Sequence, residues 1–162
     1  EHFCSFVQTN PNQMIRNNFV KKVSEYKQVD CGGPLFNNIG YVLPRDDAKH
    51  KHKFIADRKF NIAFENGYYP GYATEKILDG LYAKTIPVYL GSYTIDRDFN
   101  TDRFINGHNH TDINKLLDIM IDIDNDDKKW LEIVNQPVWK DGVMPDVADE
   151  NNFLDWWESY VE

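Results

Sequence analysis

The segment from Phe60 to Gly91 limits the fold of this 162-residue chain more than any other stretch of the sequence. It opens with an apolar run, Phe60 to Phe64, and closes with another, Ile86 to Leu90, and such short runs predict buried strands. Between them lie a loop with Gly and Pro, residues 65–73, and a helix that Thr74 can cap. A strand, a helix and a second strand in this order predict parallel strands joined by a helix that covers the sheet.

Strands and helices alternate in the first part of the chain as well. Residues 2–8 predict a strand, and Val29 begins a short extended piece that ends at Gly32. Asn10 and Pro11 predict the cap and the first residue of the helix between these two strands.

Further helices are predicted at residues 46–58, 112–123, 128–134 and 153–161. The helix after Thr74 is expected to bury an apolar stripe made of Ile77, Leu78, Leu81 and Tyr82. The whole pattern predicts one α/β domain over residues 1–162, a Rossmann-like parallel sheet with helices on both faces.

The composition excludes some classes of partner. A net charge of −8 and a pI of about 5.1 argue against a broad basic surface for nucleic acid. An acidic protein can still bind phosphate groups where a few cations and backbone N–H groups gather. The two cysteines, Cys4 and Cys31, are too few for a disulfide framework, and we expect free, partly buried thiols.

Polar residues gather where the strand at Phe60–Phe64 ends and the next helix begins, which is where parallel sheets bind ligands. This group comprises Glu65, Asn66, Tyr72, Thr74, Glu75 and Lys76. The helix dipole disfavours a lysine in the first turn, so an anionic ligand would explain Lys76. The alternative is an ordinary solvated helix start at Glu75 and Lys76.

Arg16 lies early in the first predicted helix, soon after the cap expected at Asn10. A guanidinium there could bind phosphate oxygens with two hydrogen bonds in the same crevice, and the alternative is a surface arginine. The sequence has neither a P-loop nor a GxGxxG motif, so no kinase-type or dinucleotide fingerprint is present.

The same region carries a family resemblance. The runs Phe60-Asn-Ile-Ala-Phe-Glu-Asn66, Tyr72-Ala-Thr-Glu-Lys76 and Ile86-Pro-Val-Tyr-Leu-Gly91 are similar to the hallmark region of α-1,3/4-fucosyltransferases, glycosyltransferase family 10. Agreement continues through Asn10-Pro-Asn12 and Ile15-Arg-Asn17 upstream, and it is strongest with bacterial members. Gly67 departs from the pattern, since many members carry Ser there, and this affects the expected contacts to fucose.

The resemblance implies a fold like the C-terminal, donor-binding domain of a GT-B glycosyltransferase, and inverting transfer of fucose from GDP-fucose. The acceptor would be a hydroxyl of N-acetylglucosamine or glucose in an oligosaccharide, in an α-1,3/4 linkage. Arg16 and Lys76 would neutralise the diphosphate without a metal ion or other cofactor, and Glu75 would accept hydrogen bonds from hydroxyls. The remaining expected substrate-binding residues are Asn10, Glu65, Asn66, Tyr72 and Thr74.

An acceptor domain that precedes these residues in the family is expected to supply the general base, so we expect the isolated chain to turn over little. One alternative is a nucleotide-sugar-binding or scaffolding module without catalysis, and another is an enzyme for GDP-mannose or a UDP-sugar. The parent protein is expected to be cytoplasmic or membrane-associated if it is bacterial, and a Golgi membrane protein if it is eukaryotic.

Other candidate sites are interpreted as structural. Asp122, Asp124 and Asp126 are expected to form a solvated helix end and not a metal site. The pairs His50/His52 and His108/His110 have no third ligand at a convincing spacing. The tryptophans at 130, 139, 156 and 157 are expected to serve mainly in packing.

Overall fold

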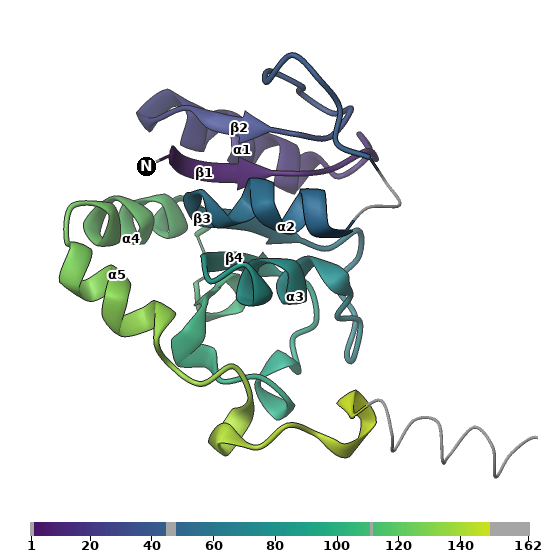
Figure 1. Cartoon of the computed structure of the whole chain (residues 1–162), viewed down its shortest axis with the longest axis vertical. Coiled ribbons are helices and arrows are strands. Elements are labelled where there is room, and N and C mark those ends of the chain that lie inside the picture. Colours follow the sequence, from purple (N-terminus) through teal and green to yellow (C-terminus); the bar gives the residue numbers. More distant parts are fainter. Residues whose placement is uncertain (1, 45–47, 111, 150–162) are drawn as a thin grey trace, which may run out of the picture.

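The computed structural model describes residues 2–44, 48–110 and 112–149. Its centre is a five-stranded sheet in the order β2-β1-β3-β4-β5, and every neighbouring pair of strands is parallel (Figure 1). The strands are β1 (His2–Phe6), β2 (Val29–Cys31), β3 (Arg58–Phe64), β4 (Ile86–Leu90) and β5 (Ile105–Asn106). The α-helices are α1 (Met14–Tyr26), α2 (Ala48–Ala56), α3 (Glu75–Tyr82), α4 (Asn114–Asp124) and α5 (Asp127–Val134).

Helices cover both faces of the sheet, as the sequence predicts. In Figure 1, α2 and α3 lie in front of the sheet and α1 lies behind β1. Alternate residues of β3 serve the two faces: Phe60 and Ile62 join the core under α1 and α4, whereas Ala63 joins the core under α3. A fully buried side chain of this size contributes about 1.5–3 kcal/mol, so this double burial makes β3 the centre of the fold.

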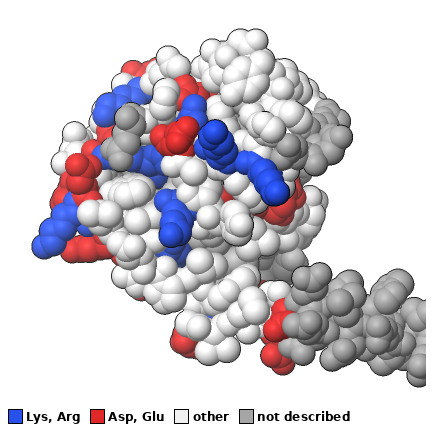
Figure 2. Space-filling model, in the orientation of Figure 1, with Lys and Arg blue, Asp and Glu red and all other residues white. Residues whose placement is uncertain are grey.

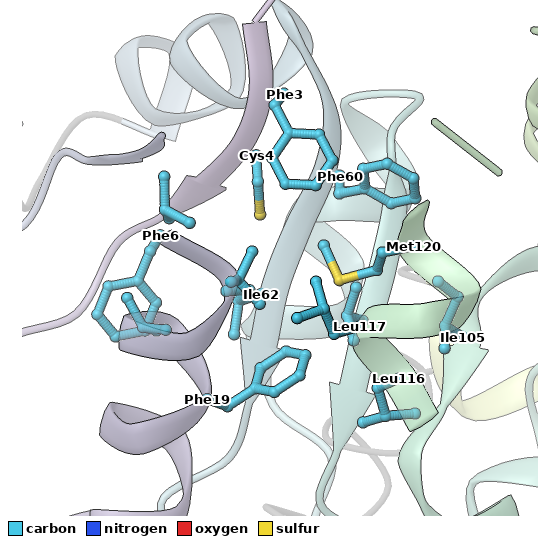
Figure 3. Packing of buried hydrophobic residues seen from close by; sticks show 14 of the residues in the cluster. Phe3, Cys4, Phe6, Phe19, Phe60, Ile62, Ile105, Leu116, Leu117 and Met120 are labelled. Atoms are coloured by element: carbon cyan, nitrogen blue, oxygen red, sulfur yellow. The ribbon is translucent and has the colours of Figure 1, made fainter. Parts of the chain in front are cut away.

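The larger core lies between the sheet and the pair α1 and α4 (Figure 3). Phe19 of α1 stacks on Phe64 of β3 with ring centroids 5.1 Å apart, and Met120 of α4 is fully buried in the same core. Cys4 and Cys31 are buried in the same core as free thiols, which confirms the expectation for both. Trp130 and Trp139 also pack against the cores, as expected, whereas Trp156, Trp157 and the helix predicted at 153–161 lie outside the described residues.

The first helix begins later than predicted. It starts at Met14, with Gln13 in the cap position, so Asn10 is not the cap. The carbonyl of Asn10 accepts a hydrogen bond from Arg16 Nη2 at 2.6 Å, and its side chain accepts one from the N–H of Asn12 at 2.9 Å. These two bonds hold residues 10–12 in a separate turn, and the helix begins only after it.

The predicted apolar stripe of α3 is correct at two positions and wrong at the other two. Ile77 and Leu81 are buried, but Leu78 and Tyr82 are 42% and 74% exposed. The reason is Gly80, which shares the inner face with Ile77 and Leu81 at helical spacing. A Cβ at Gly80 would lie 2.9 Å from the Pro87 ring of β4, so the helix approaches the sheet closely there and turns Leu78 and Tyr82 outward.

The interpretation of the acidic run as a solvated helix end is wrong for Asp124. Its side chain is 4% exposed and accepts hydrogen bonds from Tyr26 and Lys27. Asp126 caps α5 by accepting from the N–H groups of Lys128 and Lys129. In the described ranges, no group of three or more His, Cys, Asp or Glu side chains is placed to hold a metal ion, and no helix could cross a membrane.

Candidate functional site

The strand order places a crevice at the carboxyl ends of β1 and β3. The chain leaves β1 for β2 on one side and returns to β3 on the other, and parallel sheets bind ligands at such a switch point. A cavity of about 380 Å³ lies there. Its lining residues are Val7, Gln8, Thr9, Asn10, Gly33, Pro34, Leu43, Pro44, Lys51, Asn66, Glu75 and Lys76.

One wall of the cavity is formed by backbone segments in close contact. The carbonyl of Gln8, after β1, accepts a hydrogen bond from the N–H of Leu35 at 3.0 Å. A Cβ at Gly33 would lie 2.3 Å from that carbonyl oxygen, so only glycine allows the two segments to approach this closely. This contact fixes the cavity wall between β1 and β2.

Arg16 lies beneath the cavity and is fully buried. Its Nη1 donates to Asn66 Oδ1 at 2.8 Å and to the Phe64 carbonyl at 3.3 Å, and Nη2 donates to the Asn10 carbonyl. Its Nε is buried without a hydrogen-bond partner. Arg16 therefore joins the ends of β1 and β3 and positions Asn10 and Asn66, both of which line the cavity.

Glu65 is a fully buried carboxylate at the end of β3. It accepts hydrogen bonds from the backbone N–H of Thr74 at 2.8 Å and from the Thr74 hydroxyl at 2.7 and 2.9 Å. Its Oε2 also lies 3.1 Å from Lys76 Nζ. Glu65 thus fixes the start of α3 and the position of Lys76.

Lys76 and Glu75 bring opposite charges to the cavity at the N-terminus of α3. The ammonium of Lys76, 11% exposed, contacts Thr74 Oγ1 at 2.9 Å and Glu75 Oε1 at 3.3 Å, besides Glu65. Burial acts to raise the pKa of Glu75, but Lys76 and hydrogen bonds from Thr74 and Lys76 outweigh it, so the pKa is lowered. Glu75 is 61% exposed and remains an ionised hydrogen-bond acceptor.

A hydrogen-bond network fixes the loop between β3 and α3. The buried phenol of Tyr89 accepts from the Ser92 N–H at 2.8 Å and donates to the Tyr72 carbonyl at 3.4 Å. The Ser92 hydroxyl accepts from the Gly71 N–H at 2.9 Å. These bonds tie the segment after β4 to the loop before α3.

The structure brings the predicted site residues together in two layers. Asn10, Asn66, Glu75 and Lys76 line the cavity, whereas Arg16, Glu65 and Thr74 support it from below. Tyr72, which is 37% exposed, is not among the described residues that line the cavity. Sequence reasoning missed Lys51 of α2, which lines the cavity. The only signal was a run of five basic or histidine residues, 49–53, which gives no reason to single out Lys51.

Charges of both signs are mixed on the face that carries α2 and α3 (Figure 2). The loop over residues 32–44, which forms part of the cavity wall, contains no charged residue. The positive charge at the cavity therefore comes from individual side chains that the fold holds in place, and not from a broad basic surface.

Comparisons with known proteins agree with this geometry. A family model described as glycosyltransferase family 10 (fucosyltransferase) C-term matches residues 1–155. The α-(1,3)-fucosyltransferase FucT of Helicobacter pylori is 40% identical over 116 residues, which cover 72% of this chain and 23% of that protein. The putative fucosyltransferase R654 of Acanthamoeba polyphaga mimivirus is 30% identical over 153 residues, 90% of this chain and 25% of that protein. The chain thus spans about a quarter of the length of these relatives.

Solved structures show the same fold. A crystal structure of an α1,3-fucosyltransferase with GDP-fucose is similar over 100% of this chain and 48% of that chain, with a TM-score of 0.83 and 29% identity. One with GDP covers 84% of this chain and 38% of that chain, with a TM-score of 0.78 and 34% identity. The expected Rossmann-like fold of a GT-B C-terminal domain is confirmed. By its family match and its fold, the chain belongs to glycosyltransferase family 10, the fucosyltransferases, and corresponds to the family's C-terminal part.

Proposed function

We propose that residues 1–162 form the single donor-binding domain of an enzyme that transfers fucose from GDP-fucose. The observation that supports this most strongly is Lys76, held at the N-terminus of α3 inside the switch-point cavity by the buried carboxylate of Glu65. An ammonium, the N–H groups of a helix start and a carboxylate for hydroxyl groups together suit a nucleoside diphosphate sugar. Two similar structures are described as complexes with GDP and with GDP-fucose.

In this proposal, Lys76 stabilises the negative charge that grows on GDP as the bond to fucose breaks. Arg16 adds a buried positive charge beneath the site and positions Asn10 and Asn66, both on the cavity surface. We assign the neutralisation of the diphosphate to these two cations and not to a metal ion. The expected result is that excess EDTA leaves the affinity for GDP-fucose unchanged.

Glu75 takes the role of hydrogen-bond acceptor for sugar or ribose hydroxyls and not that of general base. The lowered pKa of its carboxyl makes it a weak base, whereas inverting transfer needs a base that takes a proton from the acceptor. We propose that an acceptor-binding domain of the complete enzyme supplies this base. The proposed acceptor is a hydroxyl of N-acetylglucosamine or glucose in an oligosaccharide, fucosylated in an α-1,3/4 linkage.

Calorimetric titration of the chain with GDP-fucose tests the donor site, with GDP, GDP-mannose and UDP-galactose as comparisons. We expect GDP-fucose and GDP to bind, and UDP-galactose not to bind. Lys76→Met should weaken GDP by about 10-fold or more, because a charge-assisted hydrogen bond is worth about 1.5–3 kcal/mol. Lys128→Met, which changes a lysine that is 86% exposed, is the control. A folded chain that binds none of the GDP compounds would contradict the proposal.

A transfer assay separates an enzyme from a binding module without catalysis. The chain is incubated with GDP-fucose and N-acetyllactosamine, alone and together with the acceptor domain of a family relative. The proposal expects little fucosylated product from the chain alone. Donor binding without product from any complete parent protein would favour the binding-module alternative.

A further inference from the structure

Lys51 is a second lysine of the same cavity, contributed by α2 and not by the strand ends. Its side chain is 23% exposed and is one of the two lysines that line the cavity in the part of the chain that the structure describes. Arg16, the other expected phosphate ligand, lies beneath the surface and is not among the lining residues. The positive charge that an anion meets on entering therefore belongs to Lys51 and Lys76.

The carboxylate of Asp79 on α3 holds Lys51 in place. Asp79 has a side chain only 10% exposed, and its Oδ2 forms an ion pair with Lys51 Nζ. Its other oxygen, Oδ1, lies 2.8 Å from His52 Nε2, and the His52 ring packs on Tyr82 with ring centroids 4.6 Å apart. If the Lys51 ammonium turns into the cavity, the contact of His52 with Oδ1 leaves the carboxylate of Asp79 with one of its two partners.

The net charge around Lys76 is too negative for that residue alone to bind a diphosphate. Lys76 already contacts two carboxylates, Glu65 and Glu75, so this triad carries a net negative charge. A nucleoside diphosphate carries more than one negative charge, and one lysine in that triad offsets it poorly. Lys51 also lines the cavity, so its ammonium, which is paired with Asp79, is the second cation of the cavity surface on the side of α2.

We propose that Lys51 binds the phosphate groups of the nucleotide directly, and that Asp79 is a positioning residue that keeps it at the cavity. This inference rests on the proposed donor site and adds a phosphate ligand that lies outside the family motifs in the sequence.

The test is calorimetry on the full chain with GDP, GMP and guanosine as probes. Lys51→Met keeps the apolar part of the side chain and removes the charge. The affinity for GDP should fall by about 10-fold and that for GMP by less, whereas the affinity for guanosine should not change. The reason is that only the phosphate groups interact with the ammonium. The salt dependence of GDP binding should also become shallower. Lys53→Met, an exposed position on the same helix, should match the unchanged chain.

The double variant Lys51→Met/Asp79→Asn shows whether Lys51 acts on GDP directly or only by neutralising Asp79. In Lys51→Met the carboxylate of Asp79 loses its ion pair with Lys51, and Asp79→Asn removes the carboxylate charge. Folding stability should therefore recover in the double variant, while the affinity for GDP stays low. Recovery of GDP affinity in the double variant, or equal weakening of guanosine and GDP, would overturn the role of Lys51. If GDP does not bind to the unchanged chain, the proposed function fails, and the role of Lys51 fails with it. If GDP binds and Lys51→Met changes nothing, only the role of Lys51 fails.

Discussion

Two buried arginines lie at opposite ends of β3, and their surroundings differ. At the amino end, Arg58 donates from Nε and Nη2 to the carboxylate of Asp30 at 3.1 and 3.0 Å, so its charge is neutralised. At the carboxyl end, Arg16 donates only to neutral oxygens of Asn10, Phe64 and Asn66. Among the described residues, no carboxylate forms an ion pair with Arg16.

In the proposed donor site, this difference separates an arginine that serves the fold from one that also acts on the ligand. Burial lowers the pKa of Arg16, and Tyr68 and Glu65 oppose this effect only in part, so the folded protein carries the cost of an unneutralised cation. An arginine nevertheless stays protonated, and its field reaches the cavity above it. Arg58 should therefore matter for folding alone, whereas Arg16 should matter for folding and for anion binding.

The largest expected effect is on stability at the amino end. Arg58→Met leaves the Asp30 side chain, only 5% exposed, without its main partner, and breaking a buried ion pair costs about 3–5 kcal/mol. Urea unfolding measures the loss, and the affinity of the folded protein for GDP should not change. Arg58→Met/Asp30→Asn should recover part of the stability, and a double variant no more stable than the single one would argue against an ion-pair effect.

At the carboxyl end, Arg16→Met should lower both stability and affinity. It removes three hydrogen bonds from a charged donor, and we expect a loss of about 2–3 kcal/mol in the free energy of unfolding. GDP affinity should fall by about 10-fold in protein that is still folded, as measured by calorimetry well below the unfolding temperature. Normal GDP affinity in folded Arg16→Met would break the distinction between the two arginines.

A smaller effect is expected where the cavity wall is packed against backbone. Gly33→Ala places a methyl group against the Gln8 carbonyl and should cost about 1–3 kcal/mol, as overpacking usually does. Gly32→Ala is the matched control, because its nearest neighbours are side-chain atoms of Leu43 and Phe54, which can move. Thermal unfolding of the two variants should rank Gly33→Ala as the less stable, and the reverse order would contradict a rigid wall.

The smallest effect concerns the hydrogen bonds of Tyr89. Burial raises its pKa to about 12, and Glu65 adds to this against the opposing hydrogen bond from Ser92. The pKa of Tyr89 is higher in the folded protein than its unfolded value of about 10, so the folded state favours the protonated phenol. The contribution of Tyr89 to the free energy of unfolding is therefore complete below pH 10 and is lost as the pH rises through about 12. Urea unfolding between these pH values should show a steeper loss for the unchanged chain than for Tyr89→Phe. Parallel curves for the two proteins would show that the pKa of Tyr89 is the same in the folded and the unfolded state.

Much of the fold follows from local pattern in the sequence. The strands at β3 and β4 are short apolar runs between clear breaks, and burial on both faces of a parallel sheet requires such runs. The errors arise where one contact outside the helical or strand spacing outweighs the pattern. Arg16 holds Asn10 in a turn before α1, and Gly80 brings α3 close to Pro87, and neither contact is visible in a linear sequence.

For the candidate site, the sequence indicated which residues lie close together but not how they are arranged. Motif resemblance identified Glu65, Glu75 and Lys76, yet it could not show that Glu65 is fully buried under the other two. Asp124 shows the same limit, because its partners Tyr26 and Lys27 lie about a hundred residues earlier in the chain. Lys51 belongs to a helix with several basic residues, and the sequence does not distinguish between them. Only the fold shows that Lys51 lines the cavity.

In the proposed enzyme, the three contacts of Lys76 have a consequence for binding and release of the nucleotide. An ammonium has three N–H donors, and Thr74, Glu65 and Glu75 already provide three oxygen partners, so an arriving diphosphate must replace one of them. Glu75 is the partner most exposed to solvent and the easiest to displace. In the proposed enzyme, donor arrival and GDP departure would then be exchange reactions at Lys76. The carboxylate of Glu75 would return to Lys76 when GDP leaves, so that no unpaired charge remains, and this would favour release of the product.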